Sequence, residues 1–259
     1  MKMNKIIKSI IGLILPITLL LIWELAAKKL WLPPSLSAAP SDILINCFHL
    51  FVEGILFKHL IFSLIRIFIS ISIGLFLGAF IGFMVGQFKI LDNLVSPFLG
   101  LLAPVPVVVW IPFVIMAFGT GEYYKVSLAS LATFLIIFIH TYRGVSSISK
   151  QYFELSSIYE KSWISMIRNI YLPASLPSIL TGIRIALAIS WIVIFFVEFG
   201  SSVEGSEGLG WFINDSRQMG RVEDEYAGVF TLAIAGYLTD LIVLKIQRYS
   251  LRWANYINL

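Results

Sequence analysis

The chain has 259 residues, of which 58% are hydrophobic and only 13% are charged, and its formal net charge is +4. A soluble domain carries roughly a quarter charged residues, so this composition excludes an ordinary soluble protein. The modest net charge and the lack of a basic run argue against nucleic acid as a partner. The single cysteine, Cys47, excludes an internal disulfide, and no Cys or His cluster has the spacing of metal ligands.

Six apolar segments follow one another along the chain, each suited to crossing a membrane as a helix, which takes about 20 residues. Their continuity argues against barrel strands, and backbone groups in lipid must be satisfied within their own segment. We therefore predict an all-α membrane protein with about six transmembrane helices. The first is expected to remain as a span, because no signal-peptide cleavage site follows it cleanly. The predicted spans cover residues 10–23, 59–85, 94–118, 126–142, 176–199 and 226–246.

The placement of Lys and Arg predicts the orientation of these spans. With the N-terminus inside, eleven basic residues fall in cytoplasmic segments, the termini included, and six fall outside. Because basic residues concentrate in cytoplasmic loops, this bias predicts a multi-pass protein with both termini in the cytoplasm.

The longest predicted cytoplasmic connection, residues 143–173, carries the most informative pattern. It has mixed polarity, whereas the other cytoplasmic links are short, and long internal segments usually serve a function. Its interleaved charged and apolar residues suit short amphipathic helices that present apolar side chains to a partner. A helix that lies flat on lipid headgroups is the alternative.

Within this connection, Glu154-Leu155-Ser156 is followed after three residues by Glu160, and after nine more by Ile170-Tyr171-Leu172-Pro173. The arrangement resembles the E-A-A-x3-G-x9-I-x-L-P signature of the permeases of ATP-binding-cassette (ABC) importers, with every interval kept. Leu155 and Ser156 replace the two alanines, and Glu160 replaces the glycine. Because glycine would permit a tight turn between two short helices, Glu160 predicts a longer first helix.

The resemblance covers most of residues 60–253. It is carried by motifs that are similar to those of permeases serving sulfonate, taurine, nitrate, bicarbonate and thiamine-precursor uptake. On this resemblance, residues 1–58 form an N-terminal span and external segment, 59–253 form the permease core, and 254–259 form a C-terminal tail. The motifs are Ser63-Leu64-Ile65-Arg66, Pro104-Val105-Pro106, Pro112, Phe118-Gly119-Thr120-Gly121-Glu122 with Lys125, Leu180-Thr181-Gly182-Ile183-Arg184-Ile185-Ala186-Leu187, and Gly208-Leu209-Gly210-Trp211-Phe212-Ile213.

The resemblance implies a type I ABC importer permease fold in a bacterial plasma (inner) membrane. In this family two permease subunits form the pore, a cytoplasmic ATPase dimer drives it, and an extracytoplasmic solute-binding protein delivers the solute. We expect a second copy of this chain as the other permease and lipid around both. The chain has no G-x-x-x-x-G-K-S/T phosphate loop, so ATP and Mg are expected on the partner subunit. We expect no cofactor on this chain, which is not itself an enzyme.

The connection around Glu154 would then be the coupling helix that docks on the ATPase. Its carboxylate can favour a helix N-terminus or meet a basic group of the partner. The candidate coupling residues are Phe153, Glu154, Leu155, Ser156, Tyr159, Glu160, Leu172 and Pro173.

A glycine repeat in the second span predicts close helix packing. Gly74, Gly78, Gly82 and Gly86 recur at every fourth residue, so they share one helix face and let a neighbouring backbone approach. Static packing is the simpler interpretation, and a seam that slides during transport is the alternative.

The third predicted span carries four prolines. Pro97, Pro104, Pro106 and Pro112 each remove a backbone donor, so this span cannot be a straight regular helix. Kinked membrane helices commonly line cavities, which makes Pro104 and Pro106 candidates for the translocation pathway.

Two arginines in apolar segments, Arg66 and Arg184, are further pathway candidates. A charge at the centre of a membrane helix costs roughly 2.5–3.5 kcal/mol on insertion scales, so such residues usually face protein or water. They would lower the barrier for an anion, or each would simply snorkel to the nearer interface. Glu198 and Asp240 would repel an anion, and we expect them to pair helices instead.

The arginines favour a small anion such as a sulfonate, nitrate or bicarbonate as the solute. An organic heterocycle such as a thiamine precursor is the alternative within the same importer class. A passive channel is less favoured, because it would have no use for a coupling loop. A membrane-embedded enzyme would need catalytic carboxylates, a Ser and His pair or metal ligands, and none stands at diagnostic spacing.

Overall fold

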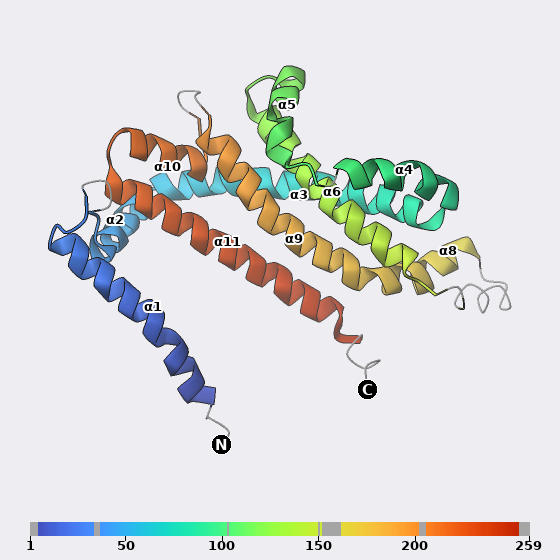
Figure 1. Cartoon of the computed structure of the whole chain (residues 1–259), viewed down its shortest axis with the longest axis horizontal. Helices are drawn as coiled ribbons and strands as arrows, with labels where there is room; N and C mark the ends of the chain where they lie inside the picture. The colour runs from blue at the N-terminus through green and yellow to red at the C-terminus, as the bar shows by residue number, and fades with distance from the viewer. Residues whose placement is uncertain are drawn as a thin grey trace.

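The structure is a computed structural model that describes residues 5–33, 37–102, 104–149, 151, 162–201 and 206–253. Its regular elements over these residues are all helices (Figure 1). In chain order they are α1 (Lys5–Lys28), α2 (Pro40–Val52), α3 (Ile55–Gln87), α4 (Lys89–Leu102), the 3-10 turn η2 (Val107–Trp110), α5 (Ile111–Phe118), α6 (Glu122–Ser146), α8 (Trp163–Met166), the π-helical turn η3 (Ile167–Tyr171), α9 (Leu172–Phe199), α10 (Leu209–Gln218) and α11 (Val222–Ser250).

Four helices of the described part are long and apolar enough to cross a membrane. They are α3, α6, α11 and the continuous helix Trp163–Phe199, which joins α8, η3 and α9. A fifth span is present if the bent pair Lys89–Leu102 and Val107–Phe118 counts as one. The helix α1 covers the predicted first span but is not among these. The all-α membrane fold is thus confirmed, with a span number close to the predicted one.

The helix α6 forms the centre of the bundle. It packs against both α3 and α9, and it is the most buried of the four spans. Large apolar side chains elsewhere point outward, for example Phe68 and Phe76 on α3. Apolar side chains on the outside suit a protein surrounded by lipid. In lipid, close packing of the helices joins them, rather than the burial of apolar surface from water.

The third predicted span is broken rather than merely kinked. Its two halves meet at a bend of 95°. Pro104 and Pro106 lie in the break, where a missing backbone donor costs least, and Pro112 lies in the first turn of α5, where proline is tolerated. Pro97 is accommodated inside α4.

The fifth span is longer than predicted. Residue 176 was its expected start, but the helix begins at Trp163 and runs through Phe199. Pro173 lacks the N–H that would bond to the carbonyl of Asn169, and its ring crowds that carbonyl. The five-residue π-helical turn Ile167–Tyr171 widens the helix just before Pro173, so the helix continues past the proline. The described helix therefore takes up the last part of the predicted 143–173 connection.

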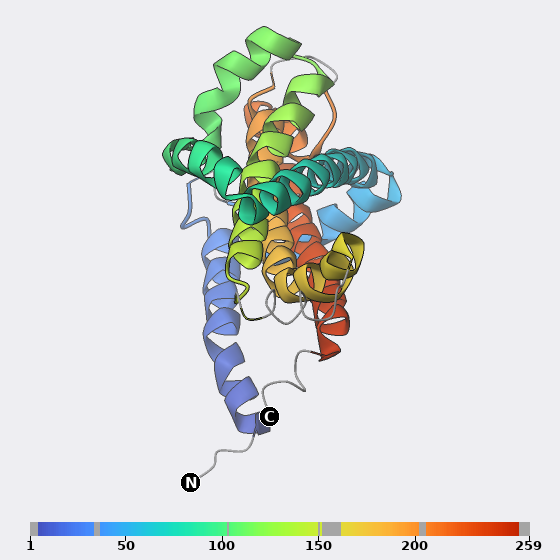
Figure 2. The same cartoon turned by 90° about the vertical axis from the view of Figure 1, so that its right-hand side faces the viewer.

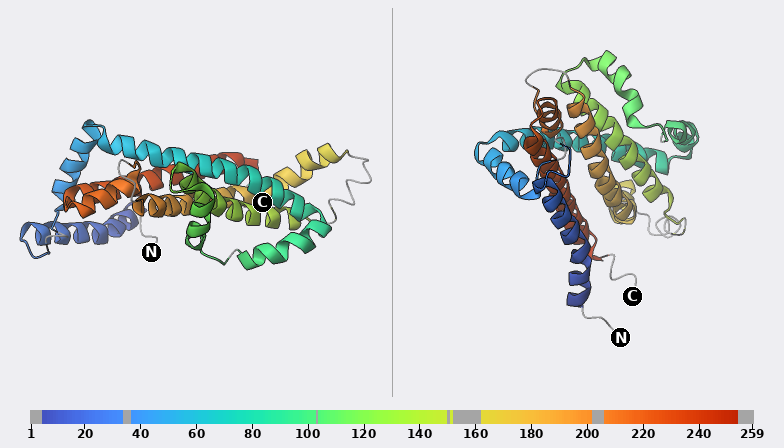
Figure 3. Two further views of the ribbon diagram at one scale, coloured as in Figure 1. Left: turned by 90° about the horizontal axis from the view of Figure 1, so that it is seen from above. Right: turned by 60° about the vertical axis from the view of Figure 1, so that its left-hand side comes forward.

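The two ends of the bundle differ in what they carry. At one end α2 and α10 lie beside the first turns of α3 and α11, and α8 lies at the opposite end (Figures 1 and 3). Side chains fasten α2 to its neighbours: Asn46 donates to Asp224 at 2.7 Å, and the Ser41 hydroxyl donates to Glu24 at 2.7 Å. Trp23 of α1 packs on Tyr226 of α11. The N-terminal part of α1 stands apart from the bundle (Figures 1 and 2).

Candidate translocation and coupling site

A buried ion pair joins α3 to α9 near the end that holds α10. Arg66 Nη1 lies 2.6 Å from Glu198 Oε1, and the side chains are only 3% and 1% exposed. Glu122, at the start of α6, binds the same guanidinium through two contacts, Nε to Oε2 at 2.6 Å and Nη2 to Oε1 at 2.7 Å. The carbonyl of Glu207 accepts a further bond from Nη1 at 2.5 Å. Two carboxylates therefore neutralise Arg66 inside the protein.

The same pair holds the first turn of α10. Three successive backbone N–H groups there find side-chain acceptors on other helices: Gly208 donates to His59 Nδ1 at 3.1 Å, Leu209 to Ser63 Oγ at 2.9 Å and Gly210 to Glu198 Oε2 at 3.0 Å. These N–H groups have no partner within the helix, and the carboxylate also suits the positive end of the helix dipole. The contacts fix α10 on α3 and α9.

Both glycines of the Gly208-Leu209-Gly210 motif are required by this fit. Gly208 has φ +128°, and a Cβ on it would lie 2.3 Å from Cδ of Glu198. A Cβ on Gly210 would lie 2.5 Å from the carbonyl oxygen of Phe195. The motif thus has a packing reason that is independent of solute contact.

A buried lysine completes this end of the bundle. Lys125 is 2% exposed, and its ammonium donates to Ser206 Oγ at 2.8 Å and to Glu122 Oε1 at 3.2 Å. A cavity of about 260 Å³ lies beside it, lined in part by Arg66 and Glu207. Because each cation here faces a carboxylate, the cavity offers no excess positive charge to an anion. The geometry shows Arg66 joining α3 to α6 and α9, and its assignment to the pathway stays a prediction.

The second predicted arginine has a different setting. Arg184 on α9 forms two contacts with Asp240 on α11, Nε to Oδ1 at 2.6 Å and Nη2 to Oδ2 at 2.8 Å. The two side chains are 42% and 35% exposed. Asp240 pairs helices, as expected, but the pair remains open on one side.

The glycine repeat lies against α6. A Cβ on Gly78 would come within 2.9 Å of the Phe134 carbonyl oxygen, and one on Gly82 within 2.8 Å of the Phe138 carbonyl oxygen. At Gly74 and Gly86 a Cβ would collide with the side chains of Thr133 and Val145, which also belong to α6. The two backbones therefore touch along the whole repeat, which is close packing over the length of a span.

The predicted coupling residues fall partly outside the described structure. Phe153, Glu154, Leu155, Ser156, Tyr159 and Glu160 lie outside the described residues. Of the described ones, Leu172 is 53% exposed, and Pro173 occupies the first turn of α9. Next to them, Trp163 and Ile164 expose apolar side chains on α8, which is a surface suited to a partner.

A buried polar cluster on α3 was not predicted as a unit, although the sequence carries a signal for it. His59, Ser63, Arg66 and Ser70 are all buried on α3 and are spaced by four, three and four residues, which places them on one helix face. That face continues into the glycine repeat. The partners come from positions 56 to 149 residues away, which no local pattern specifies. Over the described residues, no three His, Cys, Asp or Glu side chains are placed to hold a metal ion.

The pattern of the family described as "Binding-protein-dependent transport system inner membrane component" matches residues 70–255. The chain belongs to this family. It is therefore a permease subunit of an ABC importer and an inner-membrane transport component rather than an enzyme, and as a member of the family it works with an ATPase and a binding protein.

Relatives across nearly the full length agree with this assignment. SsuC of Bacillus subtilis, a permease protein assigned to aliphatic sulfonate transport, is 32% identical over 94% of this chain and 87% of its own length. SsuC of Escherichia coli is 30% identical over 92% and 90%. ThiX of Halalkalibacterium halodurans, a formylaminopyrimidine transport permease, is 29% identical over 91% and 92%. The importer permease family is thus shared by relatives named for different solutes.

The fold of the permease is also found among solved structures. A chain of the MetNI methionine ABC transporter, in inward-facing conformations, aligns with a TM-score of 0.60 at 19% identity, over 73% of this chain and 92% of that chain. A chain of an amino acid ABC transporter aligns with a TM-score of 0.57 at 17% identity, over 81% and 96%. At these identities the likeness establishes the architecture of the permease.

Proposed function

We propose that this permease carries small oxyanions, with aliphatic sulfonates as the leading class. The observation that carries the proposal is the similarity to SsuC over 94% of the chain. TauC of Escherichia coli, named for taurine, is 26% identical over 91% of the chain, and CmpB of Synechococcus elongatus, named for bicarbonate, is 30% identical over 65%. All these named solutes are small and carry an oxyanion group.

A second candidate is a neutral heterocycle of the formylaminopyrimidine type. It is supported by ThiX, which is 29% identical over 91% of the chain. The two candidates differ in charge, so transport assays with both solutes separate them.

The assembly that we propose has two copies of this chain at the pore and an ATPase dimer on the cytoplasmic side. The ATPase would hold ATP and Mg and would bind the connection around Glu154, whose spacing matches the importer signature. The solute-binding protein would dock at the opposite end, near α10. Both termini would lie in the cytoplasm. The exposed basic residues Lys245, Arg248 and Arg252 at the C-terminal end of α11 support this orientation.

A single helix can carry movement between these two ends. The helix Trp163–Phe199 has 37 residues, which corresponds to about 55 Å at the rise of an α-helix. It begins next to the proposed coupling segment, and its last turn carries Glu198, which holds the first turn of α10. When ATP closes the ATPase dimer and moves the coupling segments, this helix would shift α10 together with the permease core. Hydrolysis would then reset both.

The test is uptake into proteoliposomes that contain the permease, its ATPase and its binding protein. We expect ATP-dependent uptake of an alkanesulfonate or taurine, and little uptake of a formylaminopyrimidine. Preferential uptake of the pyrimidine would instead support the second candidate. Uptake that persists without the ATPase would contradict the importer mechanism and indicate a passive channel.

A further inference from the structure

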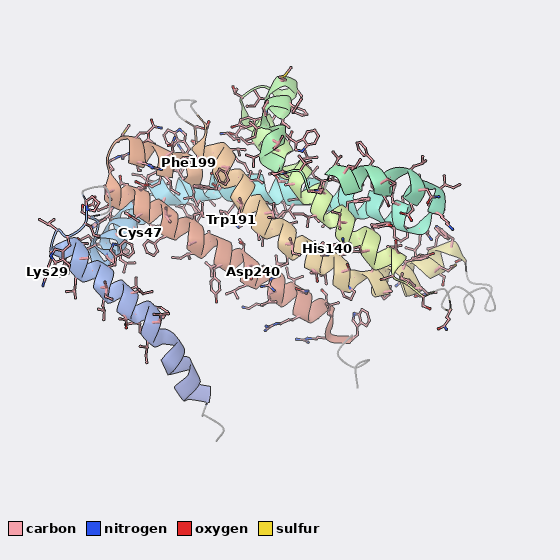
Figure 4. The ribbon with its side chains drawn as sticks, in the orientation of Figure 1. Lys29, Cys47, His140, Trp191, Phe199 and Asp240 are labelled. Atoms are coloured by element: carbon pink, nitrogen blue, oxygen red, sulfur yellow. The ribbon has the colours of Figure 1, made fainter. Side chains whose placement is uncertain are left out.

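A polar strip runs between α9 and α11 on a face that the described chain leaves partly open. It is formed by the Arg184–Asp240 pair and, toward the C-terminal end of α11, by Gln247, whose Nε2 lies 3.5 Å from Thr181 Oγ1. Figure 4 shows Asp240 in the C-terminal half of α11, beside α9. Polar groups thus follow the contact between α9 and α11 over about two helical turns.

This strip lies at a depth where lipid would be a poor solvent for it. Asp240 stands six residues inside the predicted end of its span at residue 246, which is about 9 Å along the helix axis. Arg184 stands eight residues beyond residue 176, where the continuous apolar segment of this helix begins, or about 12 Å. An arginine alone could snorkel over part of that depth. The Asp240 carboxylate has a single methylene and cannot, and it holds the guanidinium through two bonds.

The openness of the pair distinguishes it from the buried pair at the other end. Arg66 and Glu198 are at most 3% exposed, whereas Arg184 and Asp240 are 42% and 35% exposed. Ionisable side chains within membrane spans face the interior of the bundle or a water-filled cavity, and they commonly mark solute pathways. A pair that is satisfied yet partly exposed on the surface of this chain fits the second of these settings.

We infer that the polar strip between α9 and α11 lines the aqueous translocation path, and that Arg184 contacts the anionic group of the solute there. The contact between Arg184 and an anion rests on the proposed oxyanion solute. The claim that water reaches this part of the protein does not depend on the solute. Asp240 competes with the solute for the guanidinium, so the solute is held weakly enough to be released once the transporter changes conformation. Asp240 is therefore a positioning residue that limits how tightly Arg184 binds.

The presence of water along the polar strip is tested by thiol accessibility in the assembled transporter. Cys47 is the chain's one cysteine, so a Cys47→Ser background allows single reporters. Gly236→Cys places a thiol one turn from Asp240, where a Cβ meets nothing within 4 Å. Leu238→Cys is the matched control, exposed at similar depth on another face of α11. Because the thiolate is the reacting form and an apolar surrounding suppresses it, we expect the Gly236 thiol to react about tenfold or more faster with a water-soluble reagent.

Contact with anions is tested by the charge of the reagent. A thiosulfonate that bears a sulfonate group is compared with its trimethylammonium counterpart at Gly236→Cys. Asp240→Asn leaves Arg184 uncompensated and should raise the ratio of anionic to cationic reaction, and Arg184→Gln should lower it. A unit charge about 6 Å away in water changes each rate about threefold, so each ratio should change about tenfold.

The outcomes separate this inference from the proposed function. A Gly236 thiol that reacts no faster than the Leu238 thiol would overturn the inference even if alkanesulfonate uptake is observed. Ratios that neither variant changes would show a purely structural pair and overturn the role of Arg184. Fast labelling with the expected ratios, but with uptake of a neutral pyrimidine, would support the polar strip as part of an aqueous path and would contradict only the oxyanion solute.

Discussion

Substitution of Glu198 by alanine is the sharpest test of how the permease end is held together. Glu198 accepts bonds from Arg66, from Ser63 and from the backbone N–H of Gly210. Glu198→Ala removes all of these acceptors at once from a site that is closed to solvent. Arg66 keeps its two contacts with Glu122, so it does not become entirely unpaired.

The expected loss of stability follows from these contacts. Removing one partner of a buried ion pair costs about 3–5 kcal/mol, and the remaining Glu122 carboxylate places this case near the lower value. In a chain of this size, 1 kcal/mol corresponds to about 2–4 °C in the unfolding midpoint, so the midpoint should fall by about 6–12 °C. Glu198→Gln keeps an acceptor for Gly210 but loses the charge. Its unfolding midpoint should therefore lie between those of the wild type and Glu198→Ala.

The assay is thermal unfolding of the purified permease in detergent, followed by tryptophan fluorescence and checked by size-exclusion chromatography. Asp215→Ala is the matched control, because it breaks a surface pair with Arg221 at 2.7 Å, and such pairs contribute little once water screens them. A Glu198→Ala midpoint within about 2 °C of the wild type, or equal to that of the control, would refute the reasoning.

Three further predictions concern packing and coupling. Gly78→Val forces a side chain against the Phe134 carbonyl oxygen and should cost about 3 kcal/mol, the upper end for overpacking, in the same unfolding assay. Gly100→Val, where a Cβ meets nothing within 4 Å, is its control, and equal losses would contradict the packing argument. Gly208→Ala should loosen α10 and expose its first turn to amide hydrogen exchange, and unchanged protection there would count against the proposed fit. Glu154→Ala should weaken co-purification of the ATPase and slow ATP-driven uptake while leaving the unfolding midpoint unchanged, so full retention of the ATPase would argue against a role in coupling.

The spans were predictable because their signal is compositional. A run of apolar residues long enough for the bilayer admits few structures other than a helix, so α3, α6, α9 and α11 all overlap their predicted ranges. The ends of the spans were harder to predict. The fifth span begins at Trp163 instead of residue 176, because the polar residues before Pro173 are still helical and a π-helical turn accommodates the proline.

The partners of the charged residues could not be predicted from the sequence. Arg66 and Arg184 look alike as isolated arginines in apolar segments, yet one is buried between two carboxylates and the other is open to one side. The difference depends on which helices meet, and it is set by contacts between residues 56 to 132 positions apart. The face shared by His59, Ser63 and Arg66 indicates burial, but it does not name the carboxylate that meets it.

The central claim is that a cytoplasmic motor acts on this permease at the segment that precedes α8. Ser162, the N-cap of α8, offers the most direct measurement, as Ser162→Cys in the Cys47→Ser background. We predict that a membrane-impermeant thiol reagent labels this position in inside-out vesicles but not in right-side-out vesicles, and that bound ATPase protects it. Labelling from the outside would contradict the account, because no cytoplasmic ATPase could then reach the segment.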